Sequence, residues 1–395
     1  MLRPLSILLF LCSTAYSFQA PAPTAIPSEE QGLEQEPALK IQPKKKEVKA
    51  KPKAKPKAKP AKKPKAKSSL LPAKQLENIR LQIYLDQQKF GPGVLDGKVG
   101  TYTKMAIEAY NMKMGRELSD WESVKRDAEK EVTHVFAMAT VPSVAKKFIN
   151  AELPTNDKRE AQSKEKQMSY RSMAEFMAER YHTTEDILIA LNGSKKVRNL
   201  GVRSAIRVPN VAPFLIESLA NGRSFKSDDD LSRRWVVIDT KKLQLRIFEA
   251  RFERIKPKPD DAAPKAMIVE EDYKPWDESK AKMIAAFPIT PGKPQFIHYG
   301  AWKIKNAIEF PSWRYDKSLL ETGVRSKNGL SIPAGPNNPV GVLWLGLTKS
   351  GIGIHGTNSP RTIGRARSSG CIRMANWDVV HIPTLVRPGA TVIIK

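Results

Sequence analysis

Ile354-His355-Gly356 and, after a polar loop, Ser369-Gly370-Cys371-Ile372-Arg373-Met374 form the stretch that decides the fold of this 395-residue chain. Cys371 is the only cysteine apart from Cys12, which lies in an N-terminal leader. A lone thiol is either an intermolecular partner or a reactive group. An ordinary thiol has a pKa of about 8.5 and is only a few per cent thiolate at neutral pH, so a nucleophile needs a base. We therefore interpret Cys371 as a nucleophile and His355 as its base.

The segment before the histidine predicts how that base is mounted. Ser350-Gly-Ile-Gly-Ile-His355 alternates apolar residues with glycine, which is typical of a buried strand that ends at the histidine. The basic loop that follows is long enough to fold back and bring Cys371 beside it. Gly370, directly before the cysteine, lets the backbone approach a substrate closely.

Together these residues resemble the signature of YkuD-type L,D-transpeptidases, a His-Gly followed by Ser/Thr-His-Gly-Cys and a basic residue two positions later. The resemblance covers residues 233–395 and implies a mainly-β catalytic domain within an α+β multidomain protein. It implies that Cys371 accepts the acyl group and that His355 is its base. The backbone carbonyl of Gly356 would orient the imidazole.

The resemblance also gives roles to three residues around the cysteine. The backbone amides of Gly370 and Cys371 would form an oxyanion hole, and Arg373 would bind a substrate carboxylate or hold the site in position. Ser369 stands where the family usually has histidine. Since a serine cannot carry a proton at neutral pH, we assign Ser369 a role in shaping the site.

Two small modules are expected before the catalytic domain. In the first, residues 71–150, Gly91-Pro-Gly-Val-Leu-Asp96-Gly97 lies between two predicted helices and resembles a three-helix peptidoglycan-binding domain. We expect Thr101 or Thr103 to cap the second helix. Residues 122–147 are expected to be helical from their composition.

The second module, residues 166–210, predicts strand, helix, helix and strand and resembles a LysM domain. Its helices are expected over 174–181 and 184–191, with Thr183 or Thr184 as a cap, and its last strand over 204–209. The usual Gly-Asp-Thr at the start is absent. The resemblance therefore predicts a βααβ fold and leaves glycan binding open.

The N-terminus predicts export. Residues 1–17 combine a short basic start with an apolar run too short to span a bilayer, which indicates a secretory signal peptide. Lipidation at Cys12 is the alternative, although Leu11 before it is larger than a lipobox prefers. We expect a location in the periplasm or the cell wall.

Residues 18–70 are expected to form a disordered basic tether rich in proline, alanine and lysine. Thirteen lysines and one glutamate between Lys44 and Lys67 supply +12 of the net charge of +26. This composition cannot bury a core. A solvated spacer is one interpretation, and attraction to anionic wall polymers or membrane surfaces is the other. Nucleic acid is excluded as a partner because the leader directs the chain out of the cell.

The sequence thus predicts an exported cysteine L,D-transpeptidase whose partners are peptidoglycan stem peptides and glycan. Two alternatives stay open, an L,D-carboxypeptidase with water as acceptor and a wall-binding scaffold without activity. No cofactor and no metal are predicted, because one cysteine and scattered histidines do not assemble a zinc site. The remaining histidines are interpreted as packing or surface residues, with His134 in an apolar helical patch and His298 as a candidate to line the cleft.

Overall fold

An eight-stranded sheet in the order β11-β10-β9-β6-β12-β3-β4-β5 forms the C-terminal part of the chain. The computed structural model describes residues 71–249, 281–318, 326–365 and 370–395. The predicted signal peptide, the predicted tether and Ser369 lie outside these residues. The strands of the sheet are β3 (Trp235–Asp239), β4 (Gln244–Phe248), β5 (Met283–Pro288), β6 (Gly300–Glu309), β9 (Leu343–Leu347), β10 (Gly353–His355), β11 (Ile372–Arg373) and β12 (Thr391–Ile394).

The sheet forms because its strands are runs of β-branched and apolar residues, as in Val236 to Ile238 and Val392 to Ile394. The first two strands, β3 and β4, pair antiparallel as a hairpin. The last strand, β12, lies between β3 and β6, parallel to the first and antiparallel to the second. This order places β10 and β11, which carry the predicted site, together at one edge.

Three helices build the first module: α1 (Ala73–Gln87), α2 (Thr101–Met114) and α3 (Trp121–Glu131). The predicted threonine cap of α2 is wrong, because its N-cap is Gly100 and no side chain caps it. Thr103 is inside the helix, and its buried hydroxyl instead accepts a hydrogen bond from Gln82 Nε2 (3.3 Å). Asp120 caps α3 by accepting from the backbone N–H of Ser123.

The helix expected over 122–147 is wrong beyond Glu131. Residues 136–140 form β1 (Phe136–Thr140), which pairs antiparallel with β2 (Ala205–Pro209). Tertiary pairing overrides a weak local preference for helix here. His134 consequently lies in an exposed loop before β1 and not in an apolar helical patch.

The strand expected before the two helices of the second module does not form, since Tyr170 makes only an isolated bridge to Ile149, and β2 pairs instead with β1. The partner of β2 therefore comes from the segment assigned to the first module. The predicted helices are present, with Ser172 capping α5 and Thr184 capping α6 through their side-chain oxygens. The helices are α4 (Arg159–Gln162), α5 (Met173–Arg180), α6 (Glu185–Asn192) and α7 (Ser194–Arg198).

Short elements complete the C-terminal part. The strands β7 (Trp313–Tyr315) and β8 (Leu330–Ile332) pair antiparallel as a separate ribbon. Two one-turn helices, α9 (Asn376–Val379) and α10 (Ile382–Leu385), follow β11. Among the described residues, no helix is long and apolar enough to cross a membrane.

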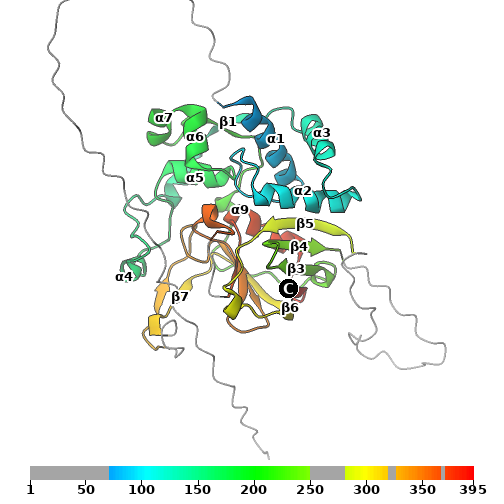
Figure 1. Cartoon of the computed structure of the whole chain (residues 1–395). Coiled ribbons are helices and arrows are strands. Elements are labelled where there is room, and N and C mark those ends of the chain that lie inside the picture. Colours follow the sequence, from blue (N-terminus) through cyan, green and yellow to red (C-terminus); the bar gives the residue numbers. More distant parts are fainter. Residues whose placement is uncertain (1–70, 250–280, 319–325, 366–369) are drawn as a thin grey trace, which may run out of the picture.

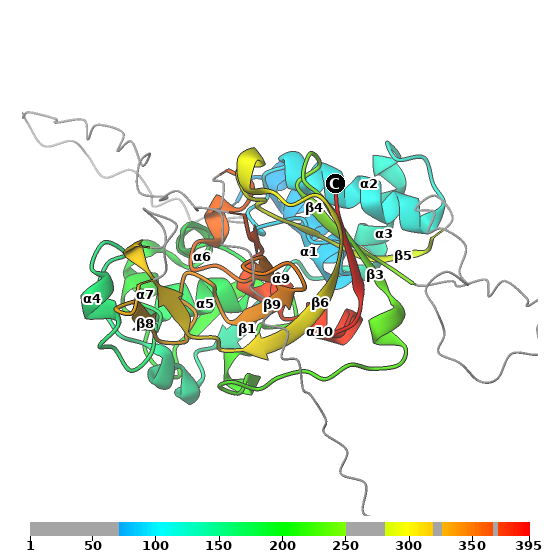
Figure 2. The same cartoon turned by 90° about the horizontal axis from the view of Figure 1, so that it is seen from below.

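The helical module and the sheet share one apolar core. Phe90 makes an isolated bridge to Ala286 in β5, and the Gly91 backbone N–H donates to the Ala286 carbonyl at 2.8 Å. Buried Ile83 and Tyr110 of the module belong to the same cluster as Val237 of the sheet. Figures 1 and 2 show α2 lying beside β5, with α9 between the modules and the strands.

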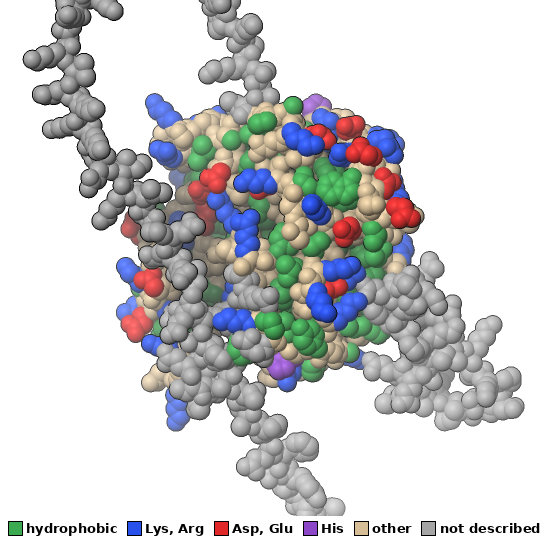
Figure 3. All heavy atoms as spheres, in the orientation of Figure 1, with side chains coloured by type: hydrophobic (Ala, Val, Ile, Leu, Met, Phe, Trp, Pro, Cys, Tyr) green, Lys and Arg blue, Asp and Glu red, His purple; other side chains and the backbone are tan. Residues whose placement is uncertain are grey.

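Charged side chains of both signs are interspersed over the described part of the face drawn in Figure 3. Arg180 and Glu217 form one two-armed ion pair, with both N–O distances at 2.9 Å. The strongly basic run between Lys44 and Lys67 lies outside the described residues.

Candidate active site

Parallel pairing of β10 with β11 brings the predicted base and the predicted nucleophile to one edge of the sheet. His355 is in register with Arg373, and Ile354 with Ile372. Since paired residues of neighbouring strands share a face, Arg373 points to the face that His355 occupies. Cys371, which is half-buried, directly precedes the strand that pairs with the strand of His355.

The His355 ring is held in one orientation. It is 4% exposed, and its Nδ1 lies 2.6 Å from the Gly356 carbonyl oxygen, which can only accept, so Nδ1 carries the proton. The ring stacks on Trp344 of β9, with centroids 5.6 Å apart. The remaining ring nitrogen, Nε2, therefore carries the lone pair.

Burial lowers the pKa of His355 from 6.5 to about 4, with a further lowering by the positive charge of Arg373. The hydrogen bond to Gly356 acts in the opposite direction and is outweighed. The imidazole is therefore neutral at pH 7 and available to accept a proton. The Cys371 thiol donates to the Gly351 carbonyl, with Sγ and O 3.6 Å apart.

Gly370 has a backbone conformation that requires glycine. Its φ is +116°, and an added Cβ would lie 2.9 Å from the Phe296 carbonyl oxygen. The backbones of Gly370 and Gly292 also touch, since a Cβ on Gly292 would lie 2.5 Å from the Gly370 Cα. The predicted close approach of backbone at Gly370 is thus used within the protein, against the loop that follows β5.

Two residues near His355 were missed by sequence reasoning, Asn376 and Glu179. The Asn376 side chain is fully buried against the turn after His355 and hydrogen-bonds to Glu179 of α5. Asn376 follows Arg373 closely, but asparagine at the start of a helix usually indicates a cap. Glu179 gave no signal, because its position 197 residues away in sequence is decided only by module docking.

The loop between His355 and Cys371 is held by other parts of the chain. The Gly364 backbone N–H donates to the Thr290 hydroxyl at 2.6 Å. The hydroxyl of Tyr102, from α2, packs against Gly364. A Cβ added to Gly364 would lie 1.0 Å from that hydroxyl oxygen. Arg361 pairs with Asp186 of α6 at 3.0 Å, but both side chains are exposed, so this pair adds little.

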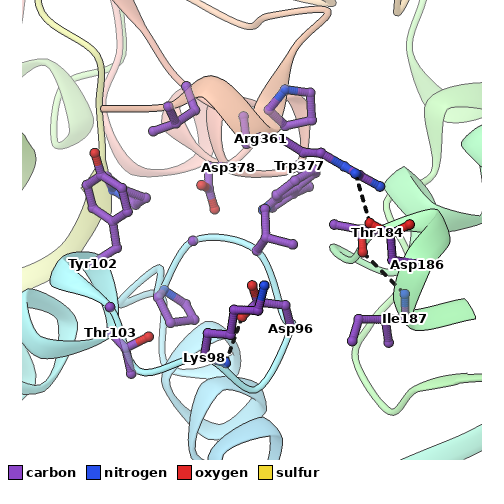
Figure 4. Close-up of a pocket in the computed structure, with 18 of the residues that line it drawn as sticks. Asp96, Lys98, Tyr102, Thr103, Thr184, Asp186, Ile187, Arg361, Trp377 and Asp378 are labelled. Atoms are coloured by element: carbon purple, nitrogen blue, oxygen red, sulfur yellow. Dashed lines mark hydrogen bonds and ion pairs between the residues drawn. The ribbon is translucent and has the colours of Figure 1, made fainter. Parts of the chain in front are cut away.

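A cavity of about 490 Å³ lies between the modules and this loop. Figure 4 shows the Asp378 carboxyl directed into the space between Tyr102 and Trp377. Oδ2 of Asp378 has no hydrogen-bond partner among the described residues, and burial raises its pKa well above the usual range. A second cavity of about 520 Å³ lies on the other side of Pro360 and Arg361.

The other histidines serve packing or lie at the surface. His182, in the second module, pairs with Asp86 of the first module at 3.0 Å and stacks on Trp377 of the C-terminal part. These two contacts join the three parts of the chain. His381 stacks on Phe287, and His298 is half-buried in the loop before β6. Within the described ranges, no group of three His, Cys, Asp or Glu side chains could hold a metal ion.

The model of the YkuD family, described as the L,D-transpeptidase catalytic domain, matches residues 273–394. The putative L,D-transpeptidase YkuD of Bacillus subtilis is 51% identical over 60 residues, 15% of this chain and 37% of that protein. The putative L,D-transpeptidase YqjB of Bacillus subtilis is 42% identical over 64 residues, 15% of this chain and 36% of that protein.

The chain thus covers little more than a third of the length of these curated relatives. Among solved structures, L,D-transpeptidase 3 from Mycobacterium tuberculosis is 14% identical, with a TM-score of 0.27 over 50% of this chain and 76% of that chain. A TM-score this low does not establish a common fold over the whole chain.

Proposed function

The chain carries a YkuD-family L,D-transpeptidase catalytic domain over residues 273–394, and from this premise we propose that it is an exported cysteine L,D-transpeptidase acting on peptidoglycan stem peptides. The proposal rests on one observation above the others. A buried, neutral His355 commits Nδ1–H to Gly356, and its strand pairs with β11, which Cys371 directly precedes. A base beside a thiol is the arrangement that nucleophilic acyl transfer needs.

In the first half of the reaction, the Cys371 thiol passes its proton to Nε2 of His355 while sulfur attacks the carbonyl carbon between an L-centre and the terminal D-residue. The tetrahedral intermediate collapses, the C–N bond breaks, and His355 returns the proton to the leaving amine. D-alanine departs, and the stem remains attached to Cys371 as a thioester.

In the second half, an acceptor amine attacks the thioester and His355 takes its proton, which then returns to the thiolate. The new amide cross-links two stems or attaches a protein to the wall. The amides of Gly370 and Cys371 are proposed to stabilise the oxyanion, and Arg373 to hold a substrate carboxylate. Ser369 is proposed to shape this pocket.

Stem peptides and glycan are the proposed partners. The two modules are proposed to bind the wall polymer, and the basic tether to contact anionic wall or membrane surfaces. The proposed location is the periplasm or the cell wall, with the leader at residues 1–17 providing export.

Two alternatives make different predictions. An L,D-carboxypeptidase would use water in the second half and release a tripeptide stem without cross-links. A scaffold would bind the wall and catalyse neither reaction.

The test is mass analysis of muropeptides after incubation of peptidoglycan with the purified protein and with Cys371→Ala. We expect cross-linked products from the wild type and none from the variant. Identical profiles would reject an enzyme, and tripeptide products alone would favour the carboxypeptidase. Because family members are acylated by carbapenems, the wild type should also gain the mass of one carbapenem, and Cys371→Ala should not.

A further inference from the structure

Asn376, the first residue of α9, holds the backbone turn that follows His355. Its Oδ1 accepts hydrogen bonds from the backbone N–H groups of Val342 and Thr357, each at 3.2 Å. The contact is close, since a Cβ on Gly356 would lie 2.2 Å from that oxygen. The position of Asn376 therefore sets the direction of the Gly356 carbonyl, which in turn orients the His355 ring.

The amino group of the Asn376 side chain is held by residues outside the sheet. Nδ2 of Asn376 donates to Oε1 of Glu179 at 2.9 Å and to the Pro336 carbonyl at 3.3 Å. Glu179 lies in α5, is 7% exposed, and also hydrogen-bonds to the Tyr170 hydroxyl. Rotating the amide by 180° would place N–H groups against N–H groups, so the network permits one orientation only.

The helix that carries Glu179 is fixed to the catalytic part by a separate set of bonds. The Met168 backbone N–H donates to the Ala334 carbonyl, and the Asn337 N–H donates to the Met168 carbonyl, both at 2.9 Å. Asn337 Nδ2 donates to Oε1 of Glu175, one turn before Glu179, at 3.0 Å. Because α5 cannot drift relative to residues 334–337, Glu179 is a fixed point for Asn376.

We propose that Glu179, supplied by the module before the catalytic domain, is a positioning residue for catalysis: through Asn376 it fixes the turn at residues 356–357 and hence the ring of His355. The proposal rests on the catalytic role of His355 in the proposed function. The competing explanation is a hydrogen bond that only stabilises module docking. The two explanations differ in whether His355 itself changes when Glu179 is removed.

The chain offers well-matched variants. Burial raises the pKa of Glu179 from 4.5 to about 8, so the side chain is the neutral acid at pH 7 and glutamine is its close mimic. Glu179→Gln keeps an acceptor for Asn376, whereas Glu179→Leu removes it. Glu217→Gln weakens the ion pair of the adjacent Arg180 without touching Asn376, which makes it a control for general loss of docking.

The experiment uses the full chain and two readouts. The first is the rate of alkylation of Cys371 by iodoacetamide at pH 7, followed by peptide mass spectrometry. The second is the ¹⁵N spectrum of the His355 imidazole, which reports its tautomer. Glu179→Leu should slow alkylation roughly tenfold or more and mix the tautomers, because small displacements of a base are costly. Glu179→Gln and Glu217→Gln should stay within about twofold of wild type.

The outcomes separate the possibilities. Wild-type alkylation and an unchanged tautomer in Glu179→Leu would overturn the proposal, as would an equal loss in Glu217→Gln. If Glu179→Leu does not fold, Tyr170→Phe tests the same network, and we expect slower alkylation in the same direction; no change would reject the role. Alkylation does not need peptidoglycan, so the two proposals can fail separately. If the muropeptide assay shows no products but Glu179→Leu still slows alkylation, only the proposed function is rejected.

Discussion

The ionisation of His355 gives the residue-level prediction about pH. Its pKa is lowered to about 4, mainly by burial, so the ring becomes charged, and would lose its proposed function as a base, only below that pH. We expect the acid limb of kcat/KM to lie near pH 4 instead of near 6.5. Initial rates on a disaccharide tetrapeptide between pH 3.5 and 8 would measure it. An acid limb between pH 6 and 7 would show that the ring is solvated in the working enzyme.

Gly370 gives the second prediction for a single residue. Gly370→Ala places a Cβ 2.9 Å from the Phe296 carbonyl at a φ of +116°. We expect a loss of about 1 to 3 kcal/mol in unfolding free energy and at least roughly tenfold lower activity, because the backbone before Cys371 must shift. Urea unfolding and rate assays would measure both.

The matched control for that substitution is Gly222→Ala, since Gly222 also has a positive φ, +72°, but no heavy atom within 4 Å of an added Cβ. Gly222→Ala should lose only the unfolding free energy that a positive φ costs alanine, and its activity should be unchanged. Equal activity losses in both variants would mean that the close approach at Gly370 is unimportant.

Among the elements, the loop between β10 and β11 depends on α2. Gly364→Ala would drive its Cβ into the Tyr102 hydroxyl, at 1.0 Å in the unrelaxed structure. We expect lower stability and lower activity, because the loop that carries Cys371 must move. Adding Tyr102→Ala should recover part of both losses. A double-mutant cycle with a coupling of less than about 0.3 kcal/mol would contradict the contact.

The elements also show where sequence patterns sufficed. Strand β10 ends at His355 as predicted, and Thr184, one of the two predicted caps, caps α6, because alternation and side-chain caps are local properties. Strand β1 was missed, since its partner β2 lies about 70 residues later in the chain. Composition around residues 136–140 favours helix, and only long-range pairing decides otherwise.

At the scale of the whole molecule, the shared core predicts cooperative unfolding. Phe90 and Gly91 bond to β5, and buried side chains of α1 and α2 pack on the sheet. Calorimetry of the full chain should therefore show one transition with equal calorimetric and van't Hoff enthalpies. Residues 233–395 alone should be unstable or aggregate, because Ala286 and Val237 would lose their cover. Two separate transitions would show that the modules fold independently.

Glu179 links the whole fold to pH. The unfolded chain ionises this carboxyl near pH 4.5, whereas the folded chain keeps its proton up to about pH 8. Between these values the folded state binds more protons, so this group lowers stability as pH rises. The unfolding free energy of Glu179→Gln, measured relative to that of the wild type, should therefore be larger at pH 8 than at pH 5. Urea unfolding at both pH values measures it, and parallel profiles would contradict a buried neutral acid.

The sequence by itself singled out Cys371 and His355 as the candidate nucleophile and base, because Cys371 is the one cysteine outside the predicted leader and His355 ends a short apolar strand. It also pointed to Gly370 as a place of close backbone approach, but only the structure shows that its φ of +116° requires glycine. The tertiary structure decided the rest. Pairing of β10 with β11 sets His355 beside Arg373, burial lowers the pKa of the ring, and docking of α5 brings Glu179 to Asn376. Those effects depend on residues that are distant in sequence and come into contact only when the hydrophobic core packs during folding.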